Sequence, residues 1–391
     1  MKYKTINNIC NIDCNTDSVT CQDVLESELV KRFRPKKILC NYLADSFKRL
    51  GDKKKAFRVK HCGDLLDWKV FQSDSENGGF PTGTPGGSLS ETVHSDLRPA
   101  LYRANFCRER LCPMCAFRRS LKIFGQVSQI MNRIESEYDF IFLTLTVRNC
   151  LSGELEKTIT QMQNAWRCKF RNKADFKRVV KGYFKVLEVT HNLNVKSKSY
   201  NTYHPHFHCI LAVNKSYFTS RDYIKRNEWL KMWQKAYNDF LITQVDIRRV
   251  KAKTEIKQGE NFVKSLSSAV AEVAKYSVKA SDYIGKIDKN GSIKKYSDKV
   301  IDDTVSTLNF ALKNRRLAEF GGIFKDVHIQ LHLDDCEDGD LINVNGEDLR
   351  PDVSYMIYRY RWNAGVSNYE FYAKSYGDSS IMFDSETGEI L

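Results

Sequence analysis

The sequence has no apolar run that approaches the roughly 18 consecutive apolar residues of a membrane-spanning helix. Its first residues, MKYKTINNICNIDCN, also lack the apolar core of a secretion signal. Both absences argue against export and against a membrane partner. The sequence therefore predicts a protein of the cytoplasm.

Acidic residues are scarce over most of the chain. Residues 331–391 hold 13 Asp and Glu against 4 Lys and Arg, which leaves 58 Lys and Arg against 35 Asp and Glu in residues 1–330. The formal charge of +14 for the whole chain thus rises to +23 over those first 330 residues. Such an excess suits a polyanion such as nucleic acid, but a solvated lysine-rich surface gives the same signal. Charge alone does not decide between them.

Twelve cysteines in a chain without a secretion signal indicate free thiols and a metal site rather than a disulfide scaffold. Cys112 and Cys115 have the spacing of zinc ligands, Cys107 precedes them, and Cys62 lies across a Gly/Pro/Ser-rich insertion at 74–95. The four thiolates predict a closed, structural Zn²⁺ site in a module like a zinc knuckle. A redox pair fits less well, because no thioredoxin-like strand precedes the motif.

Arginines surround these cysteines and recur later in the chain. The residues predicted to bind DNA are Arg108, Arg110, Arg118, Arg119, Arg248 and Arg249, and those around the cysteines are expected to contact phosphates. Recognition of specific bases could come from the cysteine-rich region, from the later pair, or from neither.

The centre of the chain alternates strand and helix patterns. The expected strands are 139–147, 183–190, 207–213 and 242–250, and the expected helices are 118–133, 154–171, 221–240, 262–283 and 304–319. From 139 to 250 the order is strand, helix, strand, strand, helix, strand, which is the order of the ferredoxin-like unit. The predicted fold class is α+β, with a largely antiparallel ferredoxin-like sheet, flanking helices and helical or irregular extensions. Gly321 and Gly322 are expected to stop the last helix.

The composition predicts four segments. They are an N-terminal extension at 1–57 without assigned function, the cysteine-rich module at 58–125, a catalytic domain at 135–290, and a helical and acidic extension at 291–391. The acidic stretch LDDCEDGDLINVNGEDLRPD in the last segment is interpreted as a solvated loop, with a cation site as the alternative.

Two histidines predict a metal site in the catalytic domain. His206 and His208 stand two residues apart at the start of an apolar strand, so both imidazoles project from the same face. Glu188 ends the preceding strand and completes the ligand set if the two strands pair as a hairpin. Two imidazoles and one carboxylate suit Mn²⁺ or Mg²⁺, although Zn²⁺, Co²⁺ or Fe²⁺ could also bind. His191 and His204 are interpreted as water-exposed loop residues, with a role as further metal ligands as the alternative.

A candidate nucleophile lies in the predicted helix 262–283. Glu272, Tyr276 and Lys279 stand at i, i+4 and i+7, on one helical face. A phenol with a pKa of about 10 needs a metal, a base or a cation to attack a phosphodiester. Lys279 could supply that charge, and Glu272 could take a proton from the phenol or later from water. An ordinary surface ladder of Glu and Lys is the alternative.

Four motifs carry a family resemblance. In chain order they are FCRERLCPMCAFRRSLK, FLTLTV, HPHFHCILAV and EVAKYSVKASDY. Over roughly residues 58–350 the chain resembles the replication initiators of small rolling-circle plasmids from Gram-positive bacteria, which are His-hydrophobic-His (HUH) endonucleases. The motif of that name corresponds to His206-Phe207-His208, and 135–290 then corresponds to the endonuclease domain.

The resemblance implies a nicking and closing reaction on single-stranded or hairpin DNA of the plasmid origin. It implies that Tyr276 becomes joined to the 5′ phosphate at the nick and that the freed 3′ hydroxyl primes the host DNA polymerase, with a host helicase as a further partner. It also implies that Glu272 activates a water molecule that ends replication.

Three alternatives remain. A relaxase or transposase of the same chemistry would carry further domains, for which 391 residues leave little room. A zinc-containing DNA-binding repressor with a structural histidine pair would be unaffected by Tyr276→Phe. A metallohydrolase that uses bound water would form no covalent intermediate. No oligomeric state follows from the sequence.

Overall fold

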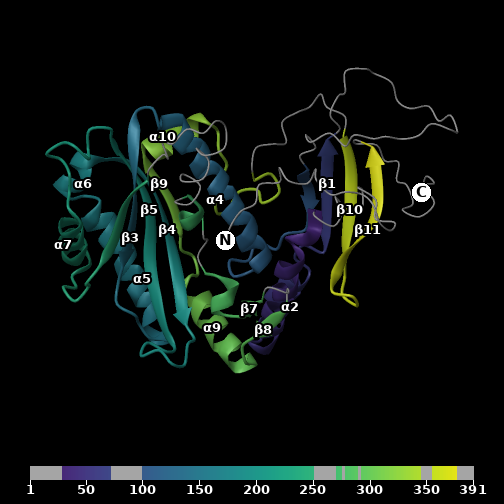
Figure 1. Ribbon diagram of the computed structural model, residues 1–391. Coiled ribbons are helices and arrows are strands. Elements are labelled where there is room, and N and C mark those ends of the chain that lie inside the picture. Colours follow the sequence, from purple (N-terminus) through teal and green to yellow (C-terminus); the bar gives the residue numbers. More distant parts are fainter. Residues whose placement is uncertain are drawn as a thin grey trace, which may run out of the picture. The chain divides into compact units, whose positions relative to one another are not determined.

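The computed structural model describes residues 29–71, 99–250, 270–274, 278–288, 292–344 and 355–376. These residues form helices and antiparallel sheets, as Figure 1 shows, which confirms the predicted α+β class. The chain divides into two compact units, one of 1–35, 63–105 and 346–391 and one of 36–62 and 106–345. None of the described helices is long and apolar enough to cross a membrane. The four functional segments expected from the sequence stay a prediction.

The larger unit is built on a five-stranded sheet in which every strand is antiparallel to its neighbours. In spatial order its strands are β6 (Val245–Val250), β3 (Tyr138–Thr146), β5 (Thr202–Asn214), β4 (Val180–Asn192) and β9 (Ala318–Gly322). With the helices α5 (Leu155–Asn164) and α7 (Arg226–Tyr237), the elements follow one another in the predicted order. All four predicted strands are therefore present in this region.

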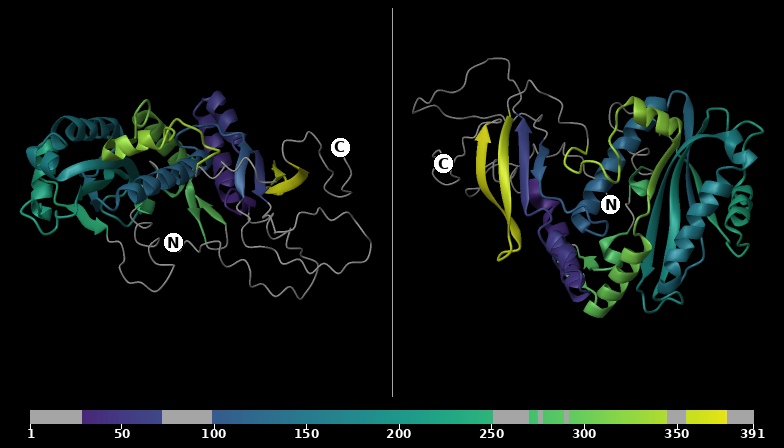
Figure 2. Two further views of the ribbon diagram at one scale, coloured as in Figure 1. Left: turned by 90° about the horizontal axis from the view of Figure 1, so that it is seen from above. Right: turned by 180° about the vertical axis from the view of Figure 1, so that it is seen from behind.

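Helices cover both faces of this sheet, so its three central strands, β3, β5 and β4, are buried on both sides. On one face, η3 (Ala165–Phe170) brings the fully buried Trp166 against Phe207 of β5, with ring centroids 6.1 Å apart. On the other face, α10 (Ile323–Gln330) packs Phe324 against Phe140 of β3, at 6.3 Å. Figure 2 shows the helices on either side of the strands. This two-sided burial explains why these three strands are nearly continuous apolar runs.

The other described helices, and the short strands β7 and β8, are not part of this sheet. They are α2 (Arg34–Arg49), α3 (Lys53–Lys60), α4 (Pro113–Ile134), η2 (Ser152–Glu154), α6 (Ala174–Val179), η4 (Ala280–Asp282), β7 (Gly285–Ile287), β8 (Ile293–Lys295) and α9 (Asp298–Ala311). The predicted helix at 118–133 corresponds to α4, and Pro113 at the first helical position starts it earlier.

The predicted continuous helix at 262–283 is wrong. Residues 270–273 are helical, but Lys279 has extended backbone angles, with φ −79° and ψ 138°, and a separate short helix, η4, follows it. Tyr276 and its two neighbours lie outside the described residues. The face that Glu272 and Lys279 were expected to share on one helix therefore does not exist.

The predicted helix at 304–319 is also wrong beyond Ala311. Helix α9 begins earlier, where the Ser297 side chain accepts a hydrogen bond from the Val300 amide, and it ends at Ala311. The chain then turns and enters β9. Gly321 and Gly322 belong to this strand and do not stop a helix.

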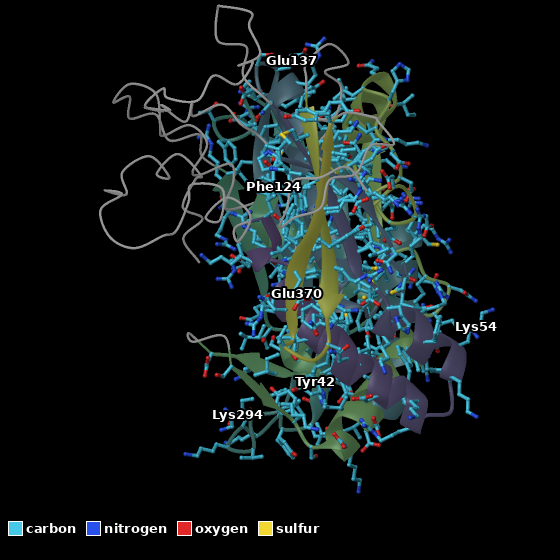
Figure 3. The ribbon with its side chains drawn as sticks, turned by 90° about the vertical axis from the view of Figure 1, so that its right-hand side faces the viewer. Tyr42, Lys54, Phe124, Glu137, Lys294 and Glu370 are labelled. Carbon is cyan, nitrogen blue, oxygen red and sulfur yellow. The ribbon has the colours of Figure 1, made fainter. Side chains whose placement is uncertain are left out.

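The smaller unit contains a second antiparallel sheet. Its strands, in spatial order, are β11 (Asn368–Tyr376), β10 (Tyr355–Asn363), β1 (Leu65–Phe71) and β2 (Ala100–Ala104). The prediction of a helical or irregular C-terminal extension is therefore wrong for 355–376. The segment YMIYRYRW is rich in aromatic residues, a strand signal, and Tyr360 is almost fully buried. At the hairpin, Asn363 donates a hydrogen bond to Glu370, which is labelled in Figure 3.

Candidate metal centres

The β4–β5 hairpin brings three predicted metal ligands together. Glu188 lies directly opposite His206, and His208 follows on the same face of β5. The Nε2 atoms of His206 and His208 lie 3.2 and 2.9 Å from Oε2 of Glu188. All three side chains are buried, and their candidate ligand atoms lie within 4.8 Å of one another. The hairpin on which the predicted ligand set depends is therefore present.

The other imidazole nitrogens already have partners. Nδ1 of His208 lies 3.2 Å from the Thr144 hydroxyl, and Nδ1 of His206 lies 3.1 Å from the carbonyl oxygen of His204. Such contacts orient an imidazole and leave Nε2 as the ligating atom, as is usual for metal-bound histidines. Two imidazole nitrogens and a carboxylate oxygen then converge on one point. This donor set fits a divalent cation.

Glu272 and Lys279 both reach this cluster, although they do not share a helix. Nζ of Lys279 lies 2.9 Å from Oε1 of Glu188, and Oε1 of Glu272 lies 4.0 Å from Nε2 of His208. Burial alone would raise the pKa of Glu188. The hydrogen bonds from the two histidines outweigh burial and lower this pKa below its ordinary value. The Glu188 carboxylate in turn outweighs burial and raises the pKa of Lys279. The cluster thus favours an ionised carboxylate beside an ammonium.

His191 and His204 lie on strands and not in an exposed loop, so that interpretation is wrong. His191 is buried, its ring stacks on Tyr203 at 4.2 Å, and its two nitrogens contact Thr304 and Asn201. For His204, burial and the neighbouring His206 lower the pKa to about 4. Neither residue belongs to the three-residue set.

Arg248 lies on the same side of the sheet as the histidines. It stands opposite Phe142 in the β3–β6 pairing, with its guanidinium 4.8 Å from the ring centroid. The Phe142 ring lies 5.6 Å from that of His208. Arg249 points to the opposite face, where it pairs with Asp139 at 2.7 Å. Of Arg248 and Arg249, Arg248 is the one beside the cluster.

The four predicted zinc ligands form a second buried cluster. The Sγ atom of Cys62 lies 3.5 Å from that of Cys112 and 3.6 Å from that of Cys115, and the Cys107 and Cys115 sulfurs are 3.7 Å apart. A tetrahedral site with zinc–sulfur bonds of about 2.3 Å would place its sulfurs about 3.8 Å apart. The amide groups of Cys107 and Arg108 point at two of the sulfurs. These residues can therefore hold a metal ion with four thiolates.

Cys40 is a fifth thiol at this cluster, and it is not one of the four predicted ligands. Its Sγ atom, on α2, lies 3.5 Å from that of Cys112 and is fully buried. No cysteine stands at ligand spacing from it, so the sequence carries no local signal of its position.

Four of the predicted DNA-binding arginines contact the segment from 312 to 342. Arg118 and Arg119 are each 5% exposed, and their guanidinium groups donate to the backbone carbonyls of Leu341 and Glu337, among others. Arg108 donates to the carbonyl of Asp338, and Arg110 to that of Leu312. Phosphate binding by these arginines stays a prediction. In the structure they hold the acidic stretch against α4 and the cysteine cluster.

The acidic stretch is accordingly not only a solvated loop. The Asp334 carboxylate pairs with the buried Lys122 at 2.7 Å, and Glu337 is buried and accepts hydrogen bonds from the amides of Leu317 and Ala318. Lys122 and Asp334 therefore neutralise each other, and the stretch is held against α4 by polar contacts.

The fold and the two clusters define the class of protein. It is an α+β protein whose antiparallel sheet carries two histidines and a glutamate able to bind a metal ion, and four cysteines elsewhere in the chain are able to bind a second one. A family model described as "Replication protein" matches residues 98–370, and the chain belongs to this family. The resemblance to the replication initiators of Gram-positive plasmids is thereby confirmed.

Several relatives match most of the chain. "Protein rep" of Bacillus amyloliquefaciens is 37% identical over 355 residues, which cover 86% of this chain and 93% of the relative. "Protein rep" of a Bacillus species is 39% identical over 329 residues, or 82% and 93% of the two chains. "Protein rep" of Streptococcus pneumoniae serotype 2 is 33% identical over 345 residues, or 87% and 91%. No solved structure matches the chain.

Proposed function

We propose that this replication initiator nicks one strand of its plasmid origin through attack by Tyr276. One observation carries the proposal. Glu272 and Lys279, four residues before and three residues after Tyr276 in the sequence, both reach the cluster of Glu188 and the two histidines. The spatial strand order β6-β3-β5-β4, with α5 and α7 as connections, supports a ferredoxin-like HUH endonuclease core.

Glu188, His206 and His208 would hold Mn²⁺ or Mg²⁺, which supplies Lewis acidity at a phosphate oxygen when bound. The Tyr276 oxygen forms a bond to phosphorus, and the bond between phosphorus and the 3′ oxygen breaks. The phenol proton leaves to solvent, and the 3′ oxygen takes one up. Lys279 lowers the cost of the phenolate by its charge. The products are a 5′-phosphotyrosyl enzyme and a 3′ hydroxyl that primes the host polymerase.

The reaction ends when a second nucleophile releases the tyrosine. In the proposed step a water molecule attacks the phosphotyrosyl phosphorus while Glu272 takes its proton. The bond between phosphorus and the Tyr276 oxygen breaks, and the phenol is protonated again. Glu272 is 35% exposed, so solvent can reach it beside His208.

The experiment that tests this function uses the purified chain, Mn²⁺ and single-stranded fragments of the DNA that flanks its own coding sequence. Denaturing electrophoresis reveals a DNA–protein adduct, and mass spectrometry of its peptides identifies the modified residue. Attachment at Tyr276 supports the proposal. Binding without an adduct would favour a repressor, and nicking without an adduct would favour a metallohydrolase.

Glu272→Ala should still form the adduct but release it at least about 100-fold more slowly, because a general base typically contributes 10²–10⁴-fold. A pulse of labelled DNA followed by an unlabelled chase measures the lifetime of the adduct. Glu272→Asp, which keeps a carboxylate, should recover part of the release rate. If Glu272→Ala instead abolishes the adduct while DNA binding is intact, Glu272 acts in the first step.

We also propose that the four-cysteine cluster holds a structural Zn²⁺. Cys112→Ser should lose one zinc per chain and at least about 4 kcal/mol of unfolding free energy, because binding of a structural metal adds directly to folding. Elemental analysis and chemical denaturation measure the two effects. Cys168→Ser, at an exposed cysteine far from the motif in sequence, and Cys40→Ser should both keep the zinc. Full zinc content in Cys112→Ser would contradict the assignment.

A further inference from the structure

A cavity of about 750 Å³ lies at the β9 edge of the central sheet. The residues around it come from α6, the start of β4, β9 and α10, which Figure 1 labels, and from the residues that follow η3. Three of them are glycines. A Cβ atom on Gly182 would lie 2.8 Å from the amide nitrogen of Ile323, and one on Gly322, where φ is +56°, would lie 2.3 Å from the Lys181 carbonyl oxygen. The backbones therefore approach here as only glycine allows.

The lining of the cavity is strongly basic. Its cationic residues are Arg171, Lys177, Lys181, Arg316 and Lys325. Its one acidic residue among those described is Glu319, which pairs with Arg171 at 3.0 Å and accepts a hydrogen bond from the Tyr183 hydroxyl at 2.6 Å. Arg316 pairs with Asp335 outside the cavity.

Three exposed lysines of the lining form no ion pair with a carboxylate in the described part of the chain. Lys181 donates to the backbone carbonyl of Arg178, and Lys177 and Lys325 contact no acidic side chain in the described part of the chain. A concave surface that gathers unneutralised cations attracts an anion with several charges.

The aromatic rings of the lining are already packed against other rings. Phe176 and Tyr183 contact Trp166, with centroids 5.8 and 5.1 Å apart, and Phe320 contacts Phe184 at 4.7 Å. Nucleobases bind proteins by stacking on open aromatic faces, whereas phosphates need only positive charge and donors. The cavity therefore suits a phosphate backbone better than a nucleotide base.

We propose that this cavity binds the phosphodiester backbone of origin DNA away from the nick, through Lys177, Lys181 and Lys325. The identity of the ligand rests on the proposed nicking function. Gly182 and Glu188 are six residues apart on β4, so the cavity and the histidine cluster are separated by about 20 Å along the strand. At about 3.4 Å per base pair, the cavity contacts DNA about six base pairs from the scissile phosphate.

The test compares two triple variants of the full chain with the same loss of charge. The cavity variant is Lys177→Gln/Lys181→Gln/Lys325→Gln, and the control is Lys53→Gln/Lys54→Gln/Lys60→Gln on α3, where Lys54 is labelled in Figure 3. Fluorescence anisotropy with a mixed-sequence duplex of about 40 base pairs gives Kd at several salt concentrations. The cavity variant should bind at least about tenfold more weakly, with a salt slope reduced by about 2 to 3, because each lost phosphate contact removes about 0.9. The control should stay within about threefold of wild type.

Adduct formation on a short strand separates this proposal from the nicking function. An oligonucleotide of about four nucleotides centred on the nick extends about 13 Å to either side even when fully stretched. This is less than the separation of about 20 Å, so the cavity variant should form the adduct at the wild-type rate. Equal weakening of both triple variants, or an unchanged salt slope in the cavity variant, overturns this inference even if the wild type forms the adduct.

Thermal protection of the wild type by ATP and not by DNA would assign the cavity to a nucleotide and would also overturn the inference. If no adduct forms with wild type, the nicking function fails, and a lower salt slope in the cavity variant alone would still support the phosphate site.

Discussion

Tyr276→Phe should abolish the DNA–protein adduct and the nick while leaving DNA affinity within about twofold of wild type. The substitution removes one oxygen atom, which is the proposed nucleophile, and keeps the ring. Loss of a covalent nucleophile commonly costs at least about 10³-fold in rate, whereas loss of one phenol oxygen changes little in the binding of the DNA backbone. Denaturing electrophoresis measures the adduct, and anisotropy with the same DNA measures affinity.

Tyr283→Phe is the matched control, because Tyr283 is the next tyrosine along the chain. Its side chain is 1% exposed, and its hydroxyl donates to the backbone carbonyl of Leu111. The variant should lose about 1 to 3 kcal/mol of unfolding free energy, since that buried carbonyl loses its donor, and should still form the adduct. The reverse pattern, with the adduct lost only in Tyr283→Phe, would transfer the attack to a residue that the structure places in the core.

Strands β3, β4 and β5 of the central sheet could be predicted because each is a buried run bounded by polar residues, whereas the start of β9 was expected to end a helix. The same pattern predicts that His206 and His208 share a face, since side chains alternate along a strand. The position of Glu188 opposite His206 depends on the register of the hairpin. The loop at 193–201 sets that register through its own hydrogen bonds, in which the Asn192 side chain donates to Ser197 and Ser199. The pattern of apolar residues in the sequence does not predict the register of this hairpin.

Contacts between distant segments were the part that local patterns could not predict. Strand β10 pairs with β1, nearly 300 residues earlier, so neither strand is recognisable as part of a sheet from its neighbours. The arginines of α4 have the composition of a DNA-binding face, but an acidic stretch more than 200 residues later occupies Arg118 and Arg119. For Lys279 the local structure was predicted wrongly and the contact was not. Lys279 does not lie on the predicted helix, but its side chain still reaches Glu188. Composition predicted which residues carry charge and not which charges are neutralised.

His208→Ala should remove Mn²⁺ binding and reduce adduct formation by at least about 10³-fold. The substitution deletes one of three ligand atoms, and the two that remain, from Glu188 and His206, hold a divalent cation poorly. It also removes the imidazole that lies 2.9 Å from the Glu188 carboxylate, and among the described residues that carboxylate then keeps His206 and Lys279 as partners. Titration with Mn²⁺, followed by electron paramagnetic resonance, measures the loss of binding directly, and circular dichroism checks that the sheet is intact.

Two further variants test whether His208 binds Mn²⁺ directly or only lies close to the ion. His204→Gln changes a histidine on the same face of β5 that lies outside the three-residue set, so Mn²⁺ affinity should stay within about threefold. Thr144→Val removes the hydroxyl 3.2 Å from Nδ1 of His208, and affinity should fall by about 10- to 100-fold because the imidazole loses the partner that orients it. A graded series, in which wild type and His204→Gln bind alike, Thr144→Val binds more weakly and His208→Ala does not bind, is expected only if His208 is a ligand. Wild-type Mn²⁺ affinity in His208→Ala would mean that the histidine pair is structural and that the cation acts elsewhere.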